Sequence, residues 1–260
     1  MLAGGTDLFP AHQEQSLRGK IIDISRVQGM QGVRVAGDMI EIGGRTTWSE
    51  IVKAKLLLGF DGLKEAAREV GSVQIQNQGT VAGNICNASP AADGVTALMA
   101  LDAEVTLASV KGERSLPLTE FIQGNRKTQK RADELLVMVR IPRRLENAVS
   151  TFLKLGARRY LVISIVMVAV NLLPDAEGII QEARVCVGSC APRSMRLLEL
   201  ENTLVGRTAG SGLNRILRAH HFAELSPIDD VRATAEYRRE AAQTLVGRAL
   251  QVCDEKVARG

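Results

Sequence analysis

The chain has 260 residues, of which 45% are hydrophobic and 24% are charged, the balance of a folded protein with a large buried core. The net charge is +4, but the basic residues are scattered and only 3% of residues are aromatic, which argues against a nucleic-acid-binding protein. The longest apolar run, residues 161–173, is too short to span a bilayer, and residues 1–8 lack a signal-peptide pattern. We therefore expect a cytoplasmic protein without a membrane span.

The first part of the chain is predicted to alternate turns, short strands and helices. A glycine turn at residues 3–8 is followed by a short strand at residues 21–24. Apolar and polar residues alternate on both sides of Gly37-Asp38, which predicts a β-hairpin with a two-residue turn. The S/T-x-x-E spacing of residues 47–50 is a capping box that predicts a helix start, and a second helix is expected over residues 63–70.

A run of small residues comes next, GTVAGNICNASPAADG at residues 79–94, which we interpret as a loop. A helix is expected directly after it, with Asp93 in the first turn, where the helix dipole favours a negative charge. Strands are then predicted at residues 103–109, 114–118 and 134–141.

A domain boundary is predicted near residue 148, because the pattern of elements changes there. Three long strands are expected at residues 151–155, 162–172 and 179–188. Three helical patterns follow, the clearest at residues 234–252. Strands and helices in separate blocks indicate an α+β fold class rather than repeated β-α-β units.

Four cysteines are present: Cys86, Cys186, Cys190 and Cys253. Cys186 and Cys190 are four residues apart, which is not a CxxC pair, and no histidine or second cysteine pair lies near them in the sequence. We expect buried thiols in a reducing compartment and no metal site.

The stretches AGGTDL at residues 3–8 and TVAGN at residues 80–84 share a chemistry. Glycine carries no side-chain bulk and allows positive φ, so successive backbone N–H groups can converge on an anion. Thr6, Thr80 and Asn84 add short polar side chains, and two such loops suit a pyrophosphate, although each alone is also compatible with a simple tight turn. Neither stretch is a Rossmann or Walker motif, which disfavours the common nucleotide-binding folds.

In this order, AGGTDL and TVAGNICNASPAAD resemble the flavin-binding subunit of the molybdenum hydroxylases, the family that includes xanthine dehydrogenase and carbon monoxide dehydrogenase. The segment GNRKT at residues 124–128, the strand ELLV at residues 134–137, and Phe152-Leu153-Lys154 leading to Arg158-Arg159 extend the resemblance over nearly the whole chain.

The resemblance implies a particular domain organisation. Residues 1–148 would form an FAD-binding domain of the vanillyl-alcohol-oxidase (PCMH) type, with subdomains at about residues 1–52 and 53–148 and FAD extended between them. Residues 149–260 would form a small C-terminal domain with a three-stranded antiparallel sheet and three helices. The cofactor would be non-covalent FAD, because His12, His220 and His221 are badly placed for attachment.

The resemblance also implies which residues contact FAD. Two sets would surround the pyrophosphate: Ala3, Gly4, Gly5, Thr6, Asp7 and Leu8 on one side, and Thr80, Val81, Ala82, Gly83 and Asn84 on the other. Asn87 and Asp93 would face the polar chain of the flavin, and Leu136 would touch the ring or the adenine. Lys154 would lie near the isoalloxazine, where a positive charge favours the anionic reduced flavin.

Ordinary structural roles compete with several of these assignments. Lys154 is compatible with a solvated surface charge, and Leu136 with a core position. Arg126 is compatible with a surface loop charge. Trp48 and Tyr160 are candidates for stacking on a ring, although a tryptophan at a helix start favours the core.

By resemblance, the chain is an electron-transfer subunit of an oxidoreductase. A molybdenum-cofactor subunit would oxidise the substrate, and a 2Fe–2S subunit would pass electrons to FAD here, for transfer to NAD or another acceptor. Some relatives have an Asp pair beside the flavin where this chain has Leu161-Val162, so the acceptor stays open. Ala82 stands where many relatives have a glycine, which is a mild change if φ is negative there.

Two other functions are compatible with the sequence. One is a stand-alone FAD-dependent oxidase or reductase, and the other is a non-catalytic module that uses the loops for structure or for another phosphate ligand. Relatives usually carry a strand and a helix, roughly thirty residues, before the first glycine loop. We expect that this unit is missing here and that FAD binds weakly as a result.

Overall fold

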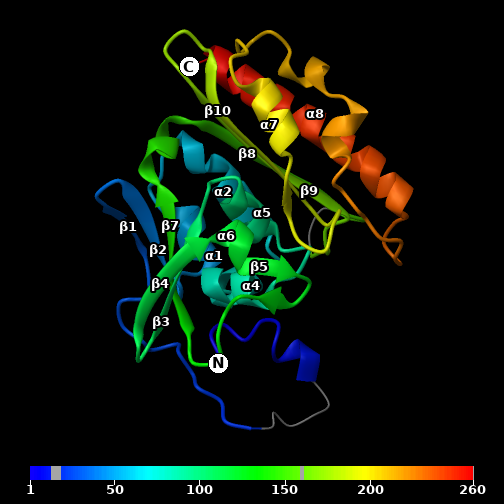
Figure 1. The fold of residues 1–260 in the computed structure, drawn as a ribbon. Helices are drawn as coiled ribbons and strands as arrows, with labels where there is room; N and C mark the ends of the chain where they lie inside the picture. Colours follow the sequence, from blue (N-terminus) through cyan, green and yellow to red (C-terminus); the bar gives the residue numbers. More distant parts are fainter. Residues whose placement is uncertain (13–18, 159–160, 260) are drawn as a thin grey trace.

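The computed structural model describes residues 1–12, 19–158 and 161–259 (Figure 1). One five-stranded sheet and one four-stranded sheet carry the fold, and a small ribbon pairs β5 (Ile122–Gly124) with β6 (Lys127–Thr128). No helix within the described ranges is long and apolar enough to cross a membrane.

The five-stranded sheet is antiparallel throughout, with the order β1-β2-β7-β3-β4. Its strands are β1 (Val33–Ala36), β2 (Met39–Gly43), β3 (Glu104–Ser109), β4 (Gly112–Pro117) and β7 (Leu135–Pro142). The predicted hairpin and the three predicted strands that follow it are confirmed. Because β2 pairs with β7, the two expected subdomains contribute strands to one sheet; the domain limits themselves stay a prediction.

Short helices pack between the two sheets (Figure 1). They are α1 (Trp48–Lys53), α2 (Asp61–Glu69), α3 (Val73–Gln78), α4 (Val81–Asn87), α5 (Asp93–Met99) and α6 (Leu118–Phe121), with 3-10 turns at Pro10–His12, Leu58–Phe60 and Arg143–Asn147. The predicted capping box is confirmed: Thr47 N–H donates to the Glu50 carboxylate at 2.8 Å, and Glu50 N–H donates to Thr47 Oγ1 at 3.3 Å.

Trp48 belongs to the core, as its position at a helix start favours, with 1% of its surface exposed. Its ring packs directly against the backbone of Gly94 in α5: a Cβ at residue 94 would lie 2.1 Å from the ring. A glycine is therefore needed at residue 94 for α5 to pack on α1. The other ring candidate, Tyr160, lies outside the described residues, as does Arg159.

The interpretation of residues 79–94 as one loop is wrong, because residues 81–87 form α4. Thr80 is its N-cap, with Oγ1 accepting the N–H of Gly83 at 3.1 Å. The helix ends at Ala88, which has a left-handed φ of 47°. The small residues serve close packing instead of a loop conformation: Ala82 N–H donates to Gly44 O at 3.0 Å.

The predicted strand at residues 21–24 is also not a full strand. Only one parallel bridge joins Leu2 to Asp23, with Leu2 N–H donating to Ile22 O at 2.8 Å and Ile24 N–H donating to Leu2 O at 2.9 Å. This bridge fixes the entry of the N-terminal segment to the fold.

The four-stranded sheet has the order β11-β10-β9-β8. Three long strands are confirmed, namely β8 (Val149–Leu155), β9 (Val166–Pro174) and β10 (Ile180–Gly188). The fourth, β11 (Met195–Arg196), has two residues and pairs with β10. The prediction of a three-stranded sheet is therefore wrong, because the sheet has one more, short strand. Two residues are too few to give a period-two pattern in the sequence.

The helical part of the second half also differs from the expected three helices. Its described residues contain two α-helices, α7 (Leu198–Leu204) and the long α8 (Ala235–Arg259), joined through 3-10 turns at Leu213–Ile216 and Ala219–Phe222. The middle helical pattern is therefore realised as two short turns rather than one helix.

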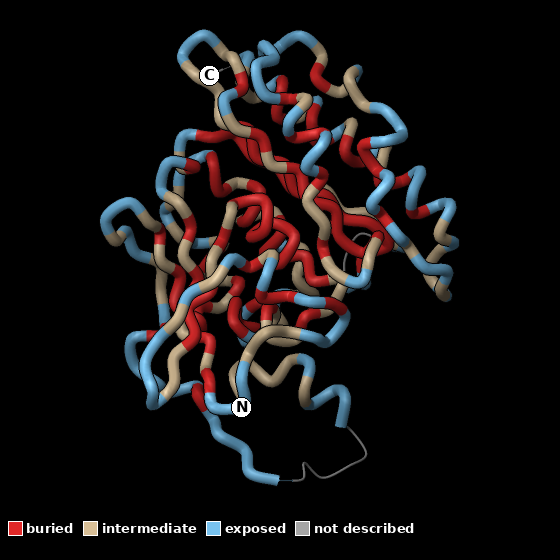
Figure 2. The backbone as a smooth tube through the Cα atoms, in the orientation of Figure 1, coloured by how far each residue is buried: buried red, intermediate tan, exposed pale blue. Residues whose placement is uncertain are grey.

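Both faces of the four-stranded sheet are buried (Figure 2). Along β9 the side chains alternate: Met167 and Ala169 join the core that includes α2 and α5, whereas Val168 and Val170 join the core under α7 and α8. This double burial explains why β9 is almost continuously apolar in sequence.

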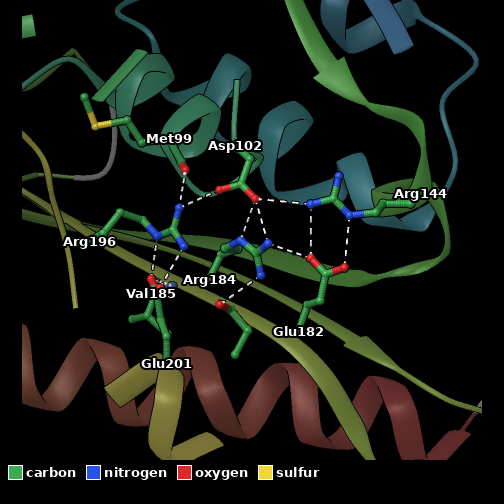
Figure 3. Close-up of polar contacts among 9 residues, drawn as sticks. Met99, Asp102, Arg144, Glu182, Arg184, Val185, Arg196 and Glu201 are labelled. Carbon is green, nitrogen blue, oxygen red and sulfur yellow. Dashed lines mark hydrogen bonds and ion pairs between the residues drawn. The ribbon is translucent and has the colours of Figure 1, made fainter. Parts of the chain in front are cut away.

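A network of charged side chains joins the two halves beside this sheet (Figure 3). Asp102, directly after α5, accepts hydrogen bonds from Arg184 Nε and Arg196 NH1, both at 2.7 Å. Glu201 binds Arg196 at 2.7 Å, and Glu182 bridges Arg184 and Arg144. The network balances three arginines against three carboxylates.

Candidate functional site

A cleft of about 450 Å³ lies where the N-terminal segment meets α3 and α4. The structure brings most of the sequence-predicted contacts together on its walls: Ala3, Gly4, Gly5, Thr6, Asp7, Leu8, Thr80, Gly83, Asn84 and Asn87. Val81, Ala82, Asp93, Leu136 and Lys154 do not line it. The two glycine-containing segments, more than seventy residues apart in sequence, thus form opposite walls of one site.

Gly4 sets the distance between these walls. A Cβ at residue 4 would lie 1.8 Å from Gln78 O, so the N-terminal segment touches the backbone at the end of α3. Gly5 has a φ of 70°, a conformation that favours glycine. The sequence AGG is therefore required by one close backbone contact and one left-handed turn.

The N-terminal wall presents free backbone donors. No described residue accepts a hydrogen bond from the N–H groups of residues 4–8, whereas the next N–H, that of Phe9, donates to Gly5 O at 3.0 Å. Consecutive unpaired N–H groups around a left-handed glycine form a concave site for an anion.

The backbone of α4 contributes differently. Its first N–H groups already have partners within the protein: Val81 N–H donates to Thr46 O at 2.9 Å, Ala82 to Gly44 O, and Gly83 to Thr80 Oγ1. The first two bonds hold α4 onto the loop between β2 and α1, and the third is the N-cap bond of α4 itself. The α4 wall therefore meets a ligand through side chains more than through backbone donors.

Asn84 is the side chain on this wall with an unmet hydrogen bond. Its Oδ1 is buried and has no partner among the described residues, although Asn84 lines the cleft. An unpaired buried amide oxygen costs about 1–3 kcal/mol of folding free energy, so a ligand donor such as a ribityl or ribose hydroxyl would offset this cost.

Arg126 joins two residues that line the cleft, Asp7 and Asn87, a role that the sequence did not assign to it. Its NH1 lies 3.0 Å from Asp7 Oδ2 and 3.5 Å from Asn87 O, and its backbone N–H donates to Ala88 O at 2.9 Å. Arg126 also has a positive φ of 57°. It therefore ties the N-terminal wall to the end of α4, and the GNRKT segment was the available signal.

Asp93 and Lys154 form a buried ion pair close to the cleft but not on its walls. Lys154 Nζ lies 2.7 Å from Asp93 Oδ2 and donates to Glu69 O at 3.1 Å, while Ser164 Oγ donates to Asp93 Oδ1 at 2.6 Å. Burial raises the pKa of Asp93, and the Lys154 charge opposes this effect. Lys154 is thus not a solvated charge: its side chain is 6% exposed.

Leu136 is a core residue of β7, with 1% of its surface exposed. Its carbonyl oxygen would lie 2.5 Å from a Cβ at residue 44, so β7, Gly44 and α4 are stacked tightly here. The core position of Leu136 is confirmed, and its contact with FAD stays a prediction.

Several apolar cleft residues were not assigned to the site from the sequence. They are Leu2, Val70, Ile75 and Cys86; Trp48, a ring-stacking candidate from the sequence, also lines the cleft. Burial raises the pKa of the Cys86 thiol to about 11, so it is uncharged at neutral pH and acts as an apolar wall. All four cysteines are free.

The residues present fit the pyrophosphate part of a dinucleotide. Free N–H groups, the Thr6 hydroxyl and a buried unpaired Asn84 oxygen supply both donors and an acceptor, and apolar side chains flank them. Fold and site together indicate a cofactor-binding protein, with a candidate phosphate site built from two segments that are distant in sequence.

Comparison with known proteins identifies the family. Residues 1–144 match the family described as the FAD binding domain in molybdopterin dehydrogenase, and residues 151–252 match the CO dehydrogenase flavoprotein C-terminal domain. The chain belongs to the FAD-binding medium subunits of the molybdenum hydroxylase family, and its cofactor is FAD.

Curated relatives and solved structures agree with this assignment. The chain is 32% identical over 254 residues to the 6-hydroxypseudooxynicotine dehydrogenase complex subunit alpha of Paenarthrobacter nicotinovorans, covering 96% of this chain and 85% of that protein. It is 30% identical over 264 residues to the caffeine dehydrogenase subunit beta of a Pseudomonas species, covering 99% and 88%. Carbon monoxide dehydrogenase of Hydrogenophaga pseudoflava superposes with a TM-score of 0.87 at 26% identity, covering 97% and 88%.

Proposed function

We propose that this chain accepts electrons from a 2Fe–2S partner subunit onto FAD and passes them to NAD or another acceptor, in a cytoplasmic complex whose molybdenum-cofactor subunit oxidises the substrate. The observation that carries the proposal is the cleft between the N-terminal segment and α4, with its row of free N–H groups. Relatives named as dehydrogenase subunits support the wider setting.

In this proposal the protein positions the cofactor and supplies no nucleophile. The N–H groups of Gly4, Gly5 and Thr6 hold the pyrophosphate, and Asn84 accepts a hydroxyl hydrogen through Oδ1. Bound FAD supplies the ability to take electrons singly and release them in pairs. Trp48 and Ile75 exclude water from the wall of the cleft beside Gly79.

Asp93 and Lys154 need a different role from the one expected of each alone. Each is the other's nearest charged partner at 2.7 Å, so neither is a free charge in this structure. We propose that they act on FAD as a buried neutral pair behind the cleft wall: Lys154 donates to Glu69 O, and the next residue, Val70, lines the cleft. Of the three remaining assigned contacts, Val81 and Ala82 hold α4 in place through their N–H groups, and Leu136 packs in the core behind Gly44.

The electron acceptor is the least constrained part of the proposal. Leu161 stands where some relatives carry an acidic residue beside the flavin, and its side chain is 52% exposed. NAD is one candidate, and a quinone or an electron-transfer protein are others.

The test compares the isolated chain with the complex. With FAD bound, the isolated chain should show no turnover of a hydroxylase substrate, and co-expression with the 2Fe–2S and molybdenum subunits should give substrate-dependent flavin bleaching. Bleaching by substrate in the isolated chain would instead support a stand-alone FAD-dependent oxidase or reductase. Purified chain that never takes up FAD would support a non-catalytic module.

A further inference from the structure

A second hollow, of about 490 Å³, lies far from the FAD cleft at the α7 end of the molecule (Figure 1). The end of α7 and the chain that follows it, through two 3-10 turns, form its walls. It shares no lining residue with the FAD cleft. Its basic lining side chains are Arg207, Arg215, Arg218, His220 and His221.

The positive charge in this hollow is uncompensated. Arg207, Arg215 and Arg218 form no ion pair with any described carboxylate, in contrast to Arg184 and Arg196 in the network beside Asp102. Within ion-pair distance of the hollow's basic side chains, the described residues supply only one carboxylate, that of Glu199, which lies 3.5 Å from His220 and is 63% exposed. Three guanidinium groups around one hollow therefore lack a counter-charge.

The backbone that carries these arginines is fixed from behind. Asp254 of α8, 7% exposed, accepts the N–H groups of Gly210 at 2.6 Å, Gly212 at 3.0 Å and Leu213 at 3.3 Å. Gly210 and Gly212 have φ of 80° and 82°, which few other residues adopt. The buried Asp254 carboxylate therefore holds this exposed turn in one conformation.

Two of these exposed arginine side chains, Arg215 and Arg218, contact the backbone around the hollow. The Arg218 guanidinium donates to Leu217 O at 2.7 Å and to Arg215 O at 2.9 Å. The Arg215 side chain lies over Gly212, with Nε 3.2 Å from where a Cβ would be. These contacts reduce the entropy cost of ordering the Arg215 and Arg218 side chains when an anion binds.

His221 adds a neutral donor to the wall. It is 5% exposed, and its Nδ1 accepts the N–H of Arg218 at 3.2 Å, so the neutral ring carries its hydrogen on Nε2. Burial, together with the neighbouring His220, lowers the pKa of His221 and so favours the neutral ring.

We propose that this hollow, formed by Arg207, Arg215, Arg218 and His221, binds the phosphate group of a small phosphorylated ligand. Guanidinium groups form paired hydrogen bonds with phosphate oxygens, and a concave site with several fixed donors suits one tetrahedral anion better than an extended surface. The proposal is independent of FAD binding, since the two sites share no residue.

The test measures binding of inorganic phosphate and pyrophosphate to the FAD-saturated full chain, by calorimetry and by the thermal midpoint, against chloride at equal ionic strength. Wild-type protein should bind with a dissociation constant of about 1 mM or below. Arg207→Gln and Arg215→Gln should each weaken binding at least tenfold. Arg239→Gln is the matched control, because Arg239 is exposed, lies on α8 and does not line the hollow.

Three results would overturn the proposal. They are absence of phosphate binding to the wild type, equal binding by the Arg215 and Arg239 variants, and binding of poly-glutamate at this site with no binding of phosphate. The last result would make the hollow a docking surface for an acidic polypeptide. Unchanged FAD affinity in the Arg207 and Arg215 variants confirms that the two sites are being measured separately.

Discussion

The contact between Gly4 and Gln78 allows a direct test of how the FAD cleft is built. Replacing Gly4 with alanine adds a Cβ that would lie 1.8 Å from Gln78 O, and real Cβ atoms stay at 3.0 Å or more from such an atom. The N-terminal wall must therefore move away from α3 by about 1.2 Å.

The size of this movement sets the expected loss of affinity. A hydrogen bond of ordinary length, about 2.9 Å, is broken when its donor moves outward by this distance. Hydrogen bonds to charged groups contribute about 1.5–3 kcal/mol each, and about 1.4 kcal/mol corresponds to a tenfold change in affinity. Loss of one N–H contact to the pyrophosphate therefore predicts that Gly4→Ala binds FAD roughly 10- to 100-fold more weakly.

Titration with FAD, followed by quenching of flavin fluorescence, measures this change. Gly124→Ala is the control, because a Cβ at residue 124 meets nothing within 4 Å and its φ is not in the left-handed region. Both variants should keep the thermal midpoint of the FAD-free protein within a few degrees. Equal FAD affinity of Gly4→Ala and wild type would refute the assignment of the N-terminal segment as the pyrophosphate wall.

Three further predictions concern the attachment of FAD, the link that Arg126 makes between two cleft-lining residues, and the free energy of unfolding. Acid precipitation should release FAD and not FMN into the supernatant; colour retained in the pellet would contradict non-covalent binding. Arg126→Ala should weaken FAD binding several-fold in the same titration, and Arg126→Lys should recover part of the loss, because the pair with Asp7 is more than half exposed and contributes modestly. Asp102→Asn should lower the free energy of unfolding in urea by about 1–2 kcal/mol. The loss is modest because Arg184 keeps Glu182 as a partner and Arg196 keeps Glu201. Asp133→Asn, an exposed control, should change the free energy of unfolding by less than about 0.5 kcal/mol. Burial opposes ionisation of Asp102, but the hydrogen bond from Arg184 and the charges of Arg196 and Arg184 outweigh it and lower its pKa. The stabilisation is thus complete above the unfolded-state pKa of about 3.9 and is lost as pH falls through the lower folded-state pKa, so the gap between wild type and Asp102→Asn should close in acid.

Local signals in the sequence were sufficient for much of the fold. Two of these signals are the capping box at Thr47 and Glu50 and the turn at Gly37-Asp38. Each involves residues at most three positions apart, so a short sequence pattern is enough to predict it. The α4 helix was missed because Gly83 and Asn84 are weak helix formers and the N-cap Thr80 has no acidic residue three positions later. Its helical state depends on tertiary bonds to Gly44 and Thr46.

In the candidate site, too, local motifs could be predicted from the sequence and long-range contacts could not. The glycine segments were visible as motifs, and the structure places both on one cleft. The pair of Asp93 with Lys154 and the pair of Arg126 with Asp7 join residues 61 and 119 positions apart. No spacing rule links residues so distant, and so each was assigned a separate role from the sequence.

The hydrophobic core that α2 and α5 share with β8 and β9 limits how the chain could be divided in the laboratory. A fragment ending near residue 148 would keep α2 and α5 but lose Phe152, Met167 and Ala169, which fill the same core from β8 and β9. The apolar sides of both helices would then face water, and Asp102 would lose Arg184 and Arg196. Such a fragment should aggregate on expression, so FAD-binding work on this protein requires both halves on one polypeptide.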